Sequence, residues 1–108
     1  MRTPDDVLDD IRKTRHELVR GSSAIYTAEV KAETADLAAQ KAEDIAFLSG
    51  EGSVDARKAQ ARIAAETELL ERAVTRAEWN RVKTKIRALE SALMSYQAEL
   101  KYMQAEGA

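Results

Sequence analysis

The stretch PDDVLDDIRKTRHELVRGSSAIYTAEVKAETADLAAQKAEDIAFL, residues 4–48, decides the fold of this chain. Small or apolar residues recur through it at alternating steps of four and three. We call this set the seam stripe, and its members are Val7, Ile11, Thr14, Leu18, Gly21, Ile25, Ala28, Ala32, Ala35, Ala39, Ala42 and Ala46. Such a heptad rhythm is typical of a helix that lies along another helix.

Local signals mark where this helix begins and where a second helix follows it. Thr3 is a good N-cap, Pro4 fits the first helical position, and two aspartates follow at the positive end of the helix dipole. Residues 49–52, Ser-Gly-Glu-Gly, are the one strong break in the body of the sequence. Ser53 is a natural cap for the next helix. We therefore predict one helix over about 4–48, a turn, and a second helix over about 53–106.

The composition supports a single all-α domain over residues 1–108. A third of the residues are charged, Ala, Glu, Lys, Leu and Arg dominate, and the chain has one proline and four glycines, which is typical of long helices. Folding back at the turn makes a long antiparallel helical hairpin that resembles a coiled coil. The numbers of opposed residues then add to roughly 101, because both helices rise equally per residue. The last ten residues are expected to overhang and to be available to a partner.

The second helix has its own seam near its end, at Val82, Ile86, Leu89, Leu93, Tyr96, Leu100 and Met103. Its register is lost around Trp79, and the opposed-residue rule places Gly21-Ser22-Ser23 across from that indole. Two interpretations stay open. The small residues leave room for Trp79 in a continuous first helix, or that helix breaks at 21–23 and the fold has three helices. The heptad passes through Gly21 in phase, which favours the continuous helix.

A second apolar stripe on the first helix predicts self-association. The alanines from Ala28 to Ala46 allow close helix approach but contribute little apolar area. A helix with two apolar stripes usually contacts two neighbours, so we expect the hairpins to assemble into a helical bundle oligomer. We call Tyr26, Val30, Leu37, Ile45 and Leu48 the outer stripe. The predicted oligomer interface consists of this outer stripe together with Tyr96, Leu100 and Met103.

Basic residues gather in the middle of the predicted hairpin, where several cations could together bind nucleic-acid phosphates. Within residues 12–20 and 72–87 they are opposed only by Glu17 and Glu78, and Trp79 offers a ring for base stacking. The predicted nucleic-acid site, which we call the basic band, is Arg12, Lys13, Arg15, Arg20, Arg72, Arg76, Trp79, Arg81, Lys83, Lys85 and Arg87.

The alternative interpretation of the basic band is a solvated coiled-coil face whose bases pair with acids of a partner hairpin. The N-terminal cluster Asp5, Asp6, Asp9 and Asp10 fits such docking. It also fits simple capping of the first helix.

The residues needed for catalysis or metal binding are not grouped in this sequence. The absence of cysteine excludes disulfides and thiol chemistry. His16 is the only histidine, so a metal site lacks convergent donors. A two-helix hairpin offers no concave site, and neither a signal peptide nor a spanning segment can be read. We expect a non-enzymatic, cytoplasmic protein with no cofactor, no metal, no small-molecule substrate and no membrane partner.

Two stretches resemble a group of small Ala-rich helical proteins of tailed bacteriophages and prophages, encoded among replication and recombination genes. They are AFLSGEGSVDARKA, residues 46–59, and RALESAL, residues 87–93, followed by Tyr96-Gln97. The resemblance covers roughly residues 43–104. It implies a phage context, with the host cytosol as the location, and a part in DNA metabolism, and it transfers no site residue.

Three functions follow as hypotheses. The first is a helical accessory protein in DNA recombination or replication that binds DNA or a recombination protein. The second is a phage-encoded inhibitor of a host nuclease or defence enzyme, which presents Glu43, Asp44, Glu51 and Asp55 in place of phosphates. The third is a structural assembly protein, a scaffold coiled coil that binds neither nucleic acid nor a small partner.

Overall fold

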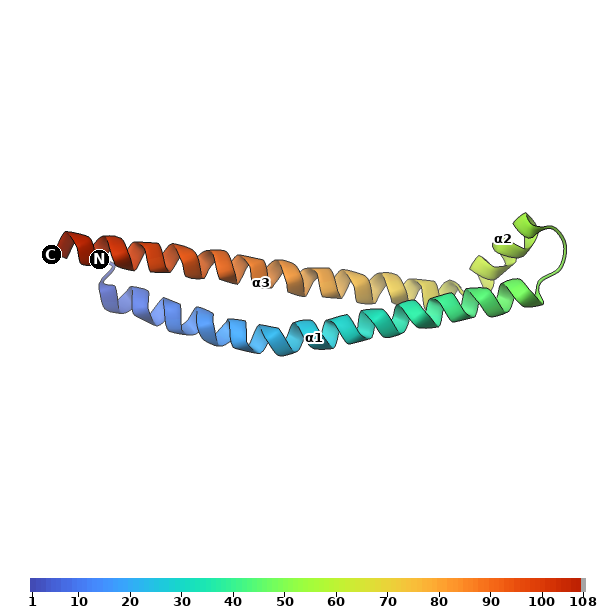
Figure 1. The fold of residues 1–108 in the computed structure, drawn as a ribbon, viewed down its shortest axis with the longest axis horizontal. Coiled ribbons are helices and arrows are strands. Elements are labelled where there is room, and N and C mark those ends of the chain that lie inside the picture. Colours follow the sequence, from blue (N-terminus) through green and yellow to red (C-terminus); the bar gives the residue numbers. More distant parts are fainter. Residues whose placement is uncertain (108) are drawn as a thin grey trace. The chain divides into compact units, whose positions relative to one another are not determined.

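The computed structural model describes residues 1–107 and forms three α-helices (Figure 1). α1 spans Pro4–Ser49, α2 spans Val54–Ala64 and α3 spans Glu66–Gly107. No strand occurs among these residues. The predicted all-α helical hairpin is confirmed, and α1 is continuous through Gly21, so the interpretation with a break at 21–23 is wrong.

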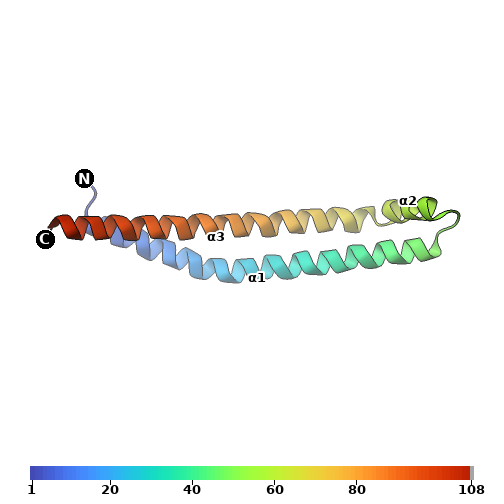
Figure 2. The same ribbon diagram turned by 45° about the horizontal axis from the view of Figure 1, so that its top comes forward.

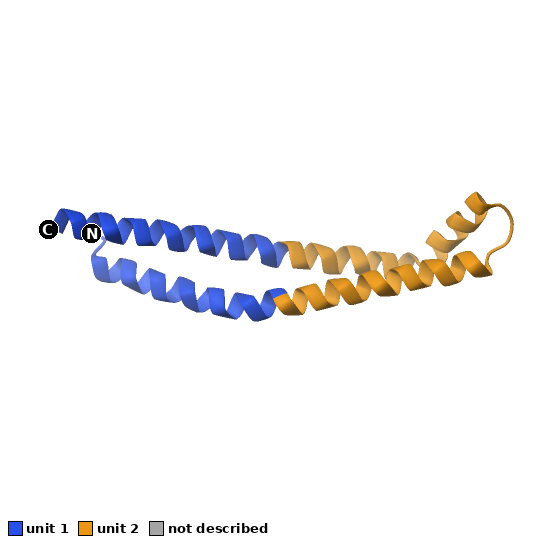
Figure 3. Ribbon diagram, viewed as in Figure 1, with its two compact units in different colours: residues 1–25, 81–108 blue, residues 26–80 orange. Residues whose placement is uncertain are grey.

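These residues fall into two compact units (Figure 3). Unit 1 consists of residues 1–25 and 81–107, where the first half of α1 lies antiparallel to the last part of α3 (Figure 2). Unit 2 consists of residues 26–80 and contains the rest of α1, all of α2 and the start of α3.

Burial along α1 follows the seam stripe. The buried residues of this helix are Val7, Ile11, Thr14, Ala28, Ala32, Ala35 and Ala39, and all of them belong to the stripe. The other members of the stripe are half-buried. Thr14 is the one polar residue among them, and its hydroxyl donates a hydrogen bond to the backbone carbonyl of Asp10 at 2.7 Å. The heptad pattern therefore predicted the core-facing side of α1.

The start of α1 is closed by two reciprocal hydrogen bonds. The backbone N–H of Asp6 donates to Thr3 Oγ1 at 3.3 Å, and the backbone N–H of Thr3 donates to the Asp6 carboxylate at 2.9 Å. This is a capping box with aspartate in the third helical position. The hydrogen bond from the Thr3 N–H lowers the pKa of Asp6 most, and the contact with the Thr3 side chain lowers it further.

The connection between α1 and α2 is held by two long polar side chains of α2. The Gln60 amide accepts from the N–H of Glu51 at 3.3 Å and donates to the Glu51 carbonyl at 3.0 Å. Arg57 Nε donates to the Phe47 carbonyl at 3.2 Å, and its guanidinium lies 4.8 Å from the centre of the Phe47 ring. Gly52 has φ +95°, a left-handed conformation that favours glycine. The predicted turn is thus confirmed.

The second half of the chain bends at Ala65, so the prediction of one uninterrupted helix over 53–106 is wrong. Ala65 has φ −96° and ψ 13°, away from helical values, and it is completely buried. Figure 1 shows α2 inclined to α3. Arg57 of α2 binds the end of α1 and Gln60 binds the turn, while α3 continues along α1 beyond the bend.

Within each unit, contacts of α1 with α3 depart from the predicted register. Gly21 lies against Ile86, whose Cγ1 is 3.2 Å from the position that a Cβ of residue 21 would occupy. The expected packing of the Trp79 indole over Gly21 is therefore wrong. Gly21 in unit 1 and Asp36 in unit 2 each meet a later residue of α3 than the opposed-residue rule predicts.

The predicted overhang of the last ten residues is wrong for residues 99–104. Glu99 binds Arg2 at the start of the chain, and Leu100 and Gln104 share a groove with Leu8 and Ile11 of α1. Residues 105–107 are exposed, and nothing lies within 4 Å of a Cβ at Gly107, while Ala108 lies outside the described residues.

We predict that Gly21→Leu lowers the free energy of unfolding by about 1–3 kcal/mol, since the new side chain must displace Ile86. Gly107→Leu is the matched control, because nothing lies within 4 Å of a Cβ at that position. Denaturant titration, monitored by circular dichroism, measures the free energy of unfolding of both variants. A Gly21→Leu protein as stable as the control would contradict the register described for unit 1.

The capping box predicts a pH-dependent effect of Asp6→Asn. A carboxyl whose pKa is lowered by folding stabilises the folded state above its unfolded pKa, and this contribution is lost as the pH falls through the folded value. The thermal midpoint of Asp6→Asn should lie below that of the wild type at pH 7. The difference should shrink below about pH 4, the ordinary range of aspartate. Asp5→Asn removes the same charge without breaking the box, and an equal loss in that variant would contradict the assignment.

Candidate nucleic-acid interface

The predicted basic band is divided between the two units. Arg72, Arg76 and Trp79 belong to unit 2. The other eight members belong to unit 1, and we call them the unit 1 basic set: Arg12, Lys13, Arg15, Arg20, Arg81, Lys83, Lys85 and Arg87. Because Gly21 lies against Ile86 in an antiparallel pair, segments 12–20 and 81–87 extend in opposite directions from this contact and overlap only near Arg20 and Arg87.

Asp36 forms ion pairs with Arg72 and Arg76, the two arginines of the basic band that lie in unit 2. Its Oδ1 lies 3.1 Å from Arg76 Nη2 and 3.7 Å from Arg72 Nη1. A carboxylate between two guanidiniums offsets part of the positive charge that they could offer to a phosphate. Sequence reasoning missed this contact because the predicted register placed Asp36 opposite an earlier part of the second helix. Trp79 is half-buried, which limits the ring area available for stacking.

One groove of unit 1 brings together two cations of the basic set. Arg20 and Lys85, which come from different helices, line it together with Glu17. The groove has a volume of about 390 Å³. Its remaining lining residues are small or apolar: Gly21, Ala24, Val82, Ile86 and Leu89. An anionic group in this groove would meet two cations and one carboxylate.

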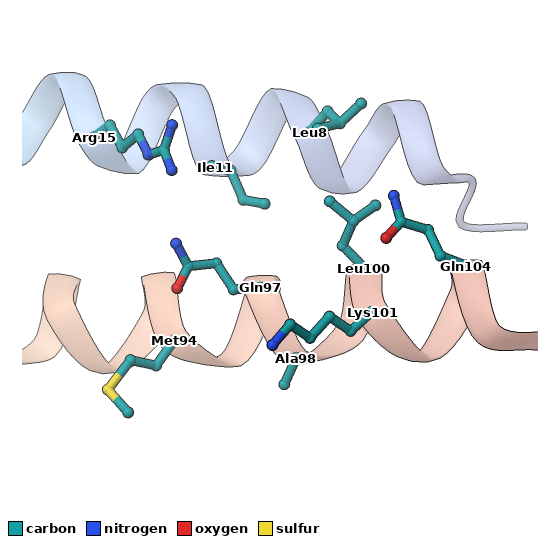
Figure 4. Close-up of a pocket in the computed structure, with 9 residues that line it drawn as sticks. All are labelled: Leu8, Ile11, Arg15, Met94, Gln97, Ala98, Leu100, Lys101 and Gln104. Carbon is teal, nitrogen blue, oxygen red and sulfur yellow. The ribbon is translucent and has the colours of Figure 1, made fainter.

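A second groove of unit 1, of about 640 Å³, contains Arg15 and Lys101. Gln97 of α3 also lines this groove, and Figure 4 shows its side chain pointing toward α1. Arg15 and Arg20 are five residues apart, which separates them by about 140° around α1. The unit 1 basic set is therefore spread around the helix pair, and the two grooves open on different flanks.

Arg2 joins the start of the chain to α3. Its guanidinium binds Glu99, lies 2.6 Å from Asp10 Oδ2, and is 5.6 Å from the centre of the Tyr96 ring. The hydrogen bonds to Glu99 and then to Asp10 raise the pKa of Arg2 above its ordinary value, so this residue stays charged. The predicted register does place Glu99 opposite Arg2, since 2 and 99 add to 101. Sequence reasoning missed this cluster because it assigned Glu99 to the C-terminal overhang.

The N-terminal acids have partners inside the chain. Asp6 belongs to the capping box, Asp10 binds Arg2, and Asp9 Oδ1 lies 3.2 Å from Nη1 of the exposed Arg12. These contacts favour the capping interpretation of the acidic cluster over its docking on a second hairpin.

The predicted oligomer interface separates into an exposed part and a packed part. The outer stripe lies in unit 2 and is exposed throughout: Tyr26 68%, Val30 45%, Leu37 65%, Ile45 55% and Leu48 75%. The C-terminal members Tyr96, Leu100 and Met103 lie in unit 1 and are half-buried. Figure 4 shows Leu100 pointing toward α1 near Leu8 and Ile11. Leu100 thus packs within the chain.

Within residues 1–107, no group of three or more His, Asp or Glu residues is arranged to hold a metal ion. His16 is exposed. None of the helices in this part of the chain combines the length and the apolar character needed to cross a membrane.

Comparison of this chain with protein-family models, with curated proteins and with solved structures found no match. The resemblance of residues 43–104 to phage proteins therefore stays a prediction.

Proposed function

We propose that this chain is a non-enzymatic helical accessory protein that binds nucleic-acid phosphates through unit 1. One observation carries the proposal: residues 12–20 and 81–87 extend along the helix pair from one contact, between Gly21 and Ile86, and carry eight cations. Glu17 is the one carboxylate within these two segments, and Asp9 pairs with Arg12. Cations that each neutralise a phosphate release condensed counterions, and their contributions to affinity add.

The placement of the cations favours contact with the backbone over reading of bases. The unit 1 basic set lies on more than one flank of the helix pair, and its members are mostly exposed. Long, flexible cations of this kind bind phosphates without sequence preference. We therefore propose that unit 1 binds nucleic acid weakly, in a salt-sensitive way and without sequence preference. Arg20 and Lys85 bind phosphates of the strand on the two sides of their shared groove. The half-buried Trp79 of unit 2 has no part in this contact.

The biological setting follows from the resemblance alone. Residues 43–104 resemble phage proteins encoded among replication and recombination genes, which suggests a role beside a recombination or replication protein on DNA in the host cytosol. Phosphate binding by unit 1 would hold such a protein on its substrate.

The inhibitor hypothesis has less support from the arrangement of charges. Glu43 and Asp44, two of the carboxylates expected to imitate phosphates, line a groove together with Lys58 and Arg62. A surface of mixed sign imitates a nucleic-acid backbone poorly, because the field of a phosphate chain is uniformly negative. The assembly hypothesis rests on a different surface, the outer stripe of unit 2.

The test is binding of labelled single- and double-stranded DNA, which fluorescence anisotropy measures between about 50 and 200 mM salt. The wild type should bind at low salt and lose affinity steeply as salt rises. Arg20→Gln/Lys85→Gln should bind more weakly, with the slope of log K against log salt reduced by about 1 for each lost cation. This loss should be similar for different DNA sequences.

Lys58→Gln/Arg62→Gln removes the same charge from unit 2 and serves as the matched control, with wild-type affinity expected. Circular dichroism verifies that all variants stay helical. Absence of binding by the folded wild type at the lowest salt, or equal losses in the two double variants, would contradict the proposal.

A further inference from the structure

We propose that the outer face of α1 in unit 2 binds the same face of a second copy of this chain, with the two helices antiparallel and Leu37 at the two-fold axis. The proposal concerns unit 2 and is independent of the cations of unit 1. It follows from the position of the outer stripe, its exposure, and a symmetry in the residues around it.

Most of the outer stripe lies on the side of α1 opposite to the seam. Tyr26 precedes the buried Ala35 by nine residues, and Leu37 follows the buried Ala28 by nine residues. At about 100° per residue, nine residues correspond to half a turn in projection around the helix. The seam alanines occupy one side of α1, so this opposite side is a separate surface with its own large apolar side chains.

The outer face is symmetric about Leu37. Its successive positions are Tyr26, Val30, Glu33, Leu37, Lys41, Asp44 and Leu48. The steps between them are 4, 3, 4, 4, 3 and 4, and they are the same when read in reverse. A two-fold interface uses one patch twice, so that patch must be complementary to itself when the direction of the chain is reversed.

Two of the three pairs on this face meet that requirement, while the third places Val30 opposite Asp44. In an antiparallel pair centred on Leu37, Tyr26 of one copy faces Leu48 of the other, which joins two exposed apolar side chains. Glu33 and Lys41, each four residues from Leu37, face each other twice as opposite charges. Both are exposed. In a parallel pair, Glu33 would face Glu33 and Lys41 would face Lys41, and these like charges would repel.

The composition of the seam explains why unit 2 gains from such a partner. Its buried α1 residues are alanines, Ala28, Ala32, Ala35 and Ala39, which bring the helices close but remove little apolar area from water. The large apolar side chains of α1 in this unit lie on the outer face. Pairing over Tyr26 to Leu48, a length of about 33 Å at 1.5 Å per residue, would bury them.

The first test is the mass of the protein in solution, measured by light scattering during size-exclusion chromatography. The wild type should have twice the 12.0 kDa mass of one chain. Leu37→Glu places two carboxylates at the axis and should raise the dissociation constant about tenfold or more. Leu70→Glu is the matched control, since Leu70 is a leucine of α3 in unit 2 with the same 65% exposure, and it should stay dimeric.

The second test determines the orientation by exchanging charges. Glu33→Lys alone and Lys41→Glu alone should each weaken the dimer, because each creates like-charge contacts. A mixture of these two single variants should form a heterodimer, since opposite charges then face each other at both sites. The double variant Glu33→Lys/Lys41→Glu should dimerise like the wild type.

A monomeric wild type at tens of micromolar would overturn the proposal. Equal weakening by Leu37→Glu and Leu70→Glu would place the contact elsewhere and overturn it as well. A dimer whose two single charge variants do not complement each other would contradict the antiparallel arrangement. None of these outcomes depends on DNA binding, so this proposal and the proposed function fail separately.

Discussion

The close approach of α1 and α3 at Gly21 is the constraint on which unit 1 depends. Residue 21 has no side chain, so Ile86 can lie where a Cβ would be in tight contact, at 3.2 Å. A Cβ there would require Ile86 to shift by a few tenths of an ångström, and a longer side chain would require a larger shift. With Gly21 against Ile86, Arg20 and Lys85 line one groove on the same two helices.

The two units differ in the size of their buried apolar residues and in their charge. Unit 1 has large apolar seam residues such as Val7 and Ile11, and it carries eight of the predicted cations. Unit 2 has an alanine seam, and the large apolar side chains of its α1 segment are exposed. A unit that buries little apolar area for its length gains most from a partner. Phosphate binding is therefore proposed for unit 1 and self-association for unit 2.

Helix content, the buried side of α1 and the first turn could be predicted because each is determined by neighbours in the sequence. The seam stripe is a repeat of three and four residues, and the capping box spans Thr3 to Asp6. Gly52 belongs to a short glycine-containing stretch that is typical of a turn. These features need no knowledge of the distant part of the chain.

The register, the bend at Ala65 and the ion pairs could not be predicted, because they depend on contacts between distant residues. Ala65 is a strong helix former, so its own side chain gives no signal of the bend, while Arg57 binds the end of α1 and Gln60 binds Glu51 of the turn. The change of register around Gly21 and Asp36 moves the contacts there, which is why Asp36 with Arg76 was not expected. Arg2 with Glu99 fits the predicted register and was missed because residue 99 was assigned to the overhang.

The most direct test of this account is disulfide trapping between α1 and α3, which is clean because the chain has no cysteine. Gly21→Cys/Ile86→Cys should close an intrachain bond under mild oxidation, detected by mass and by mobility in a non-reducing gel. Arg15→Cys/Ile86→Cys tests the register in which opposed residue numbers add to roughly 101, and its two thiols should stay reduced. Closure of the 15–86 pair with failure of the 21–86 pair would contradict the register, and with it the shared groove of Arg20 and Lys85.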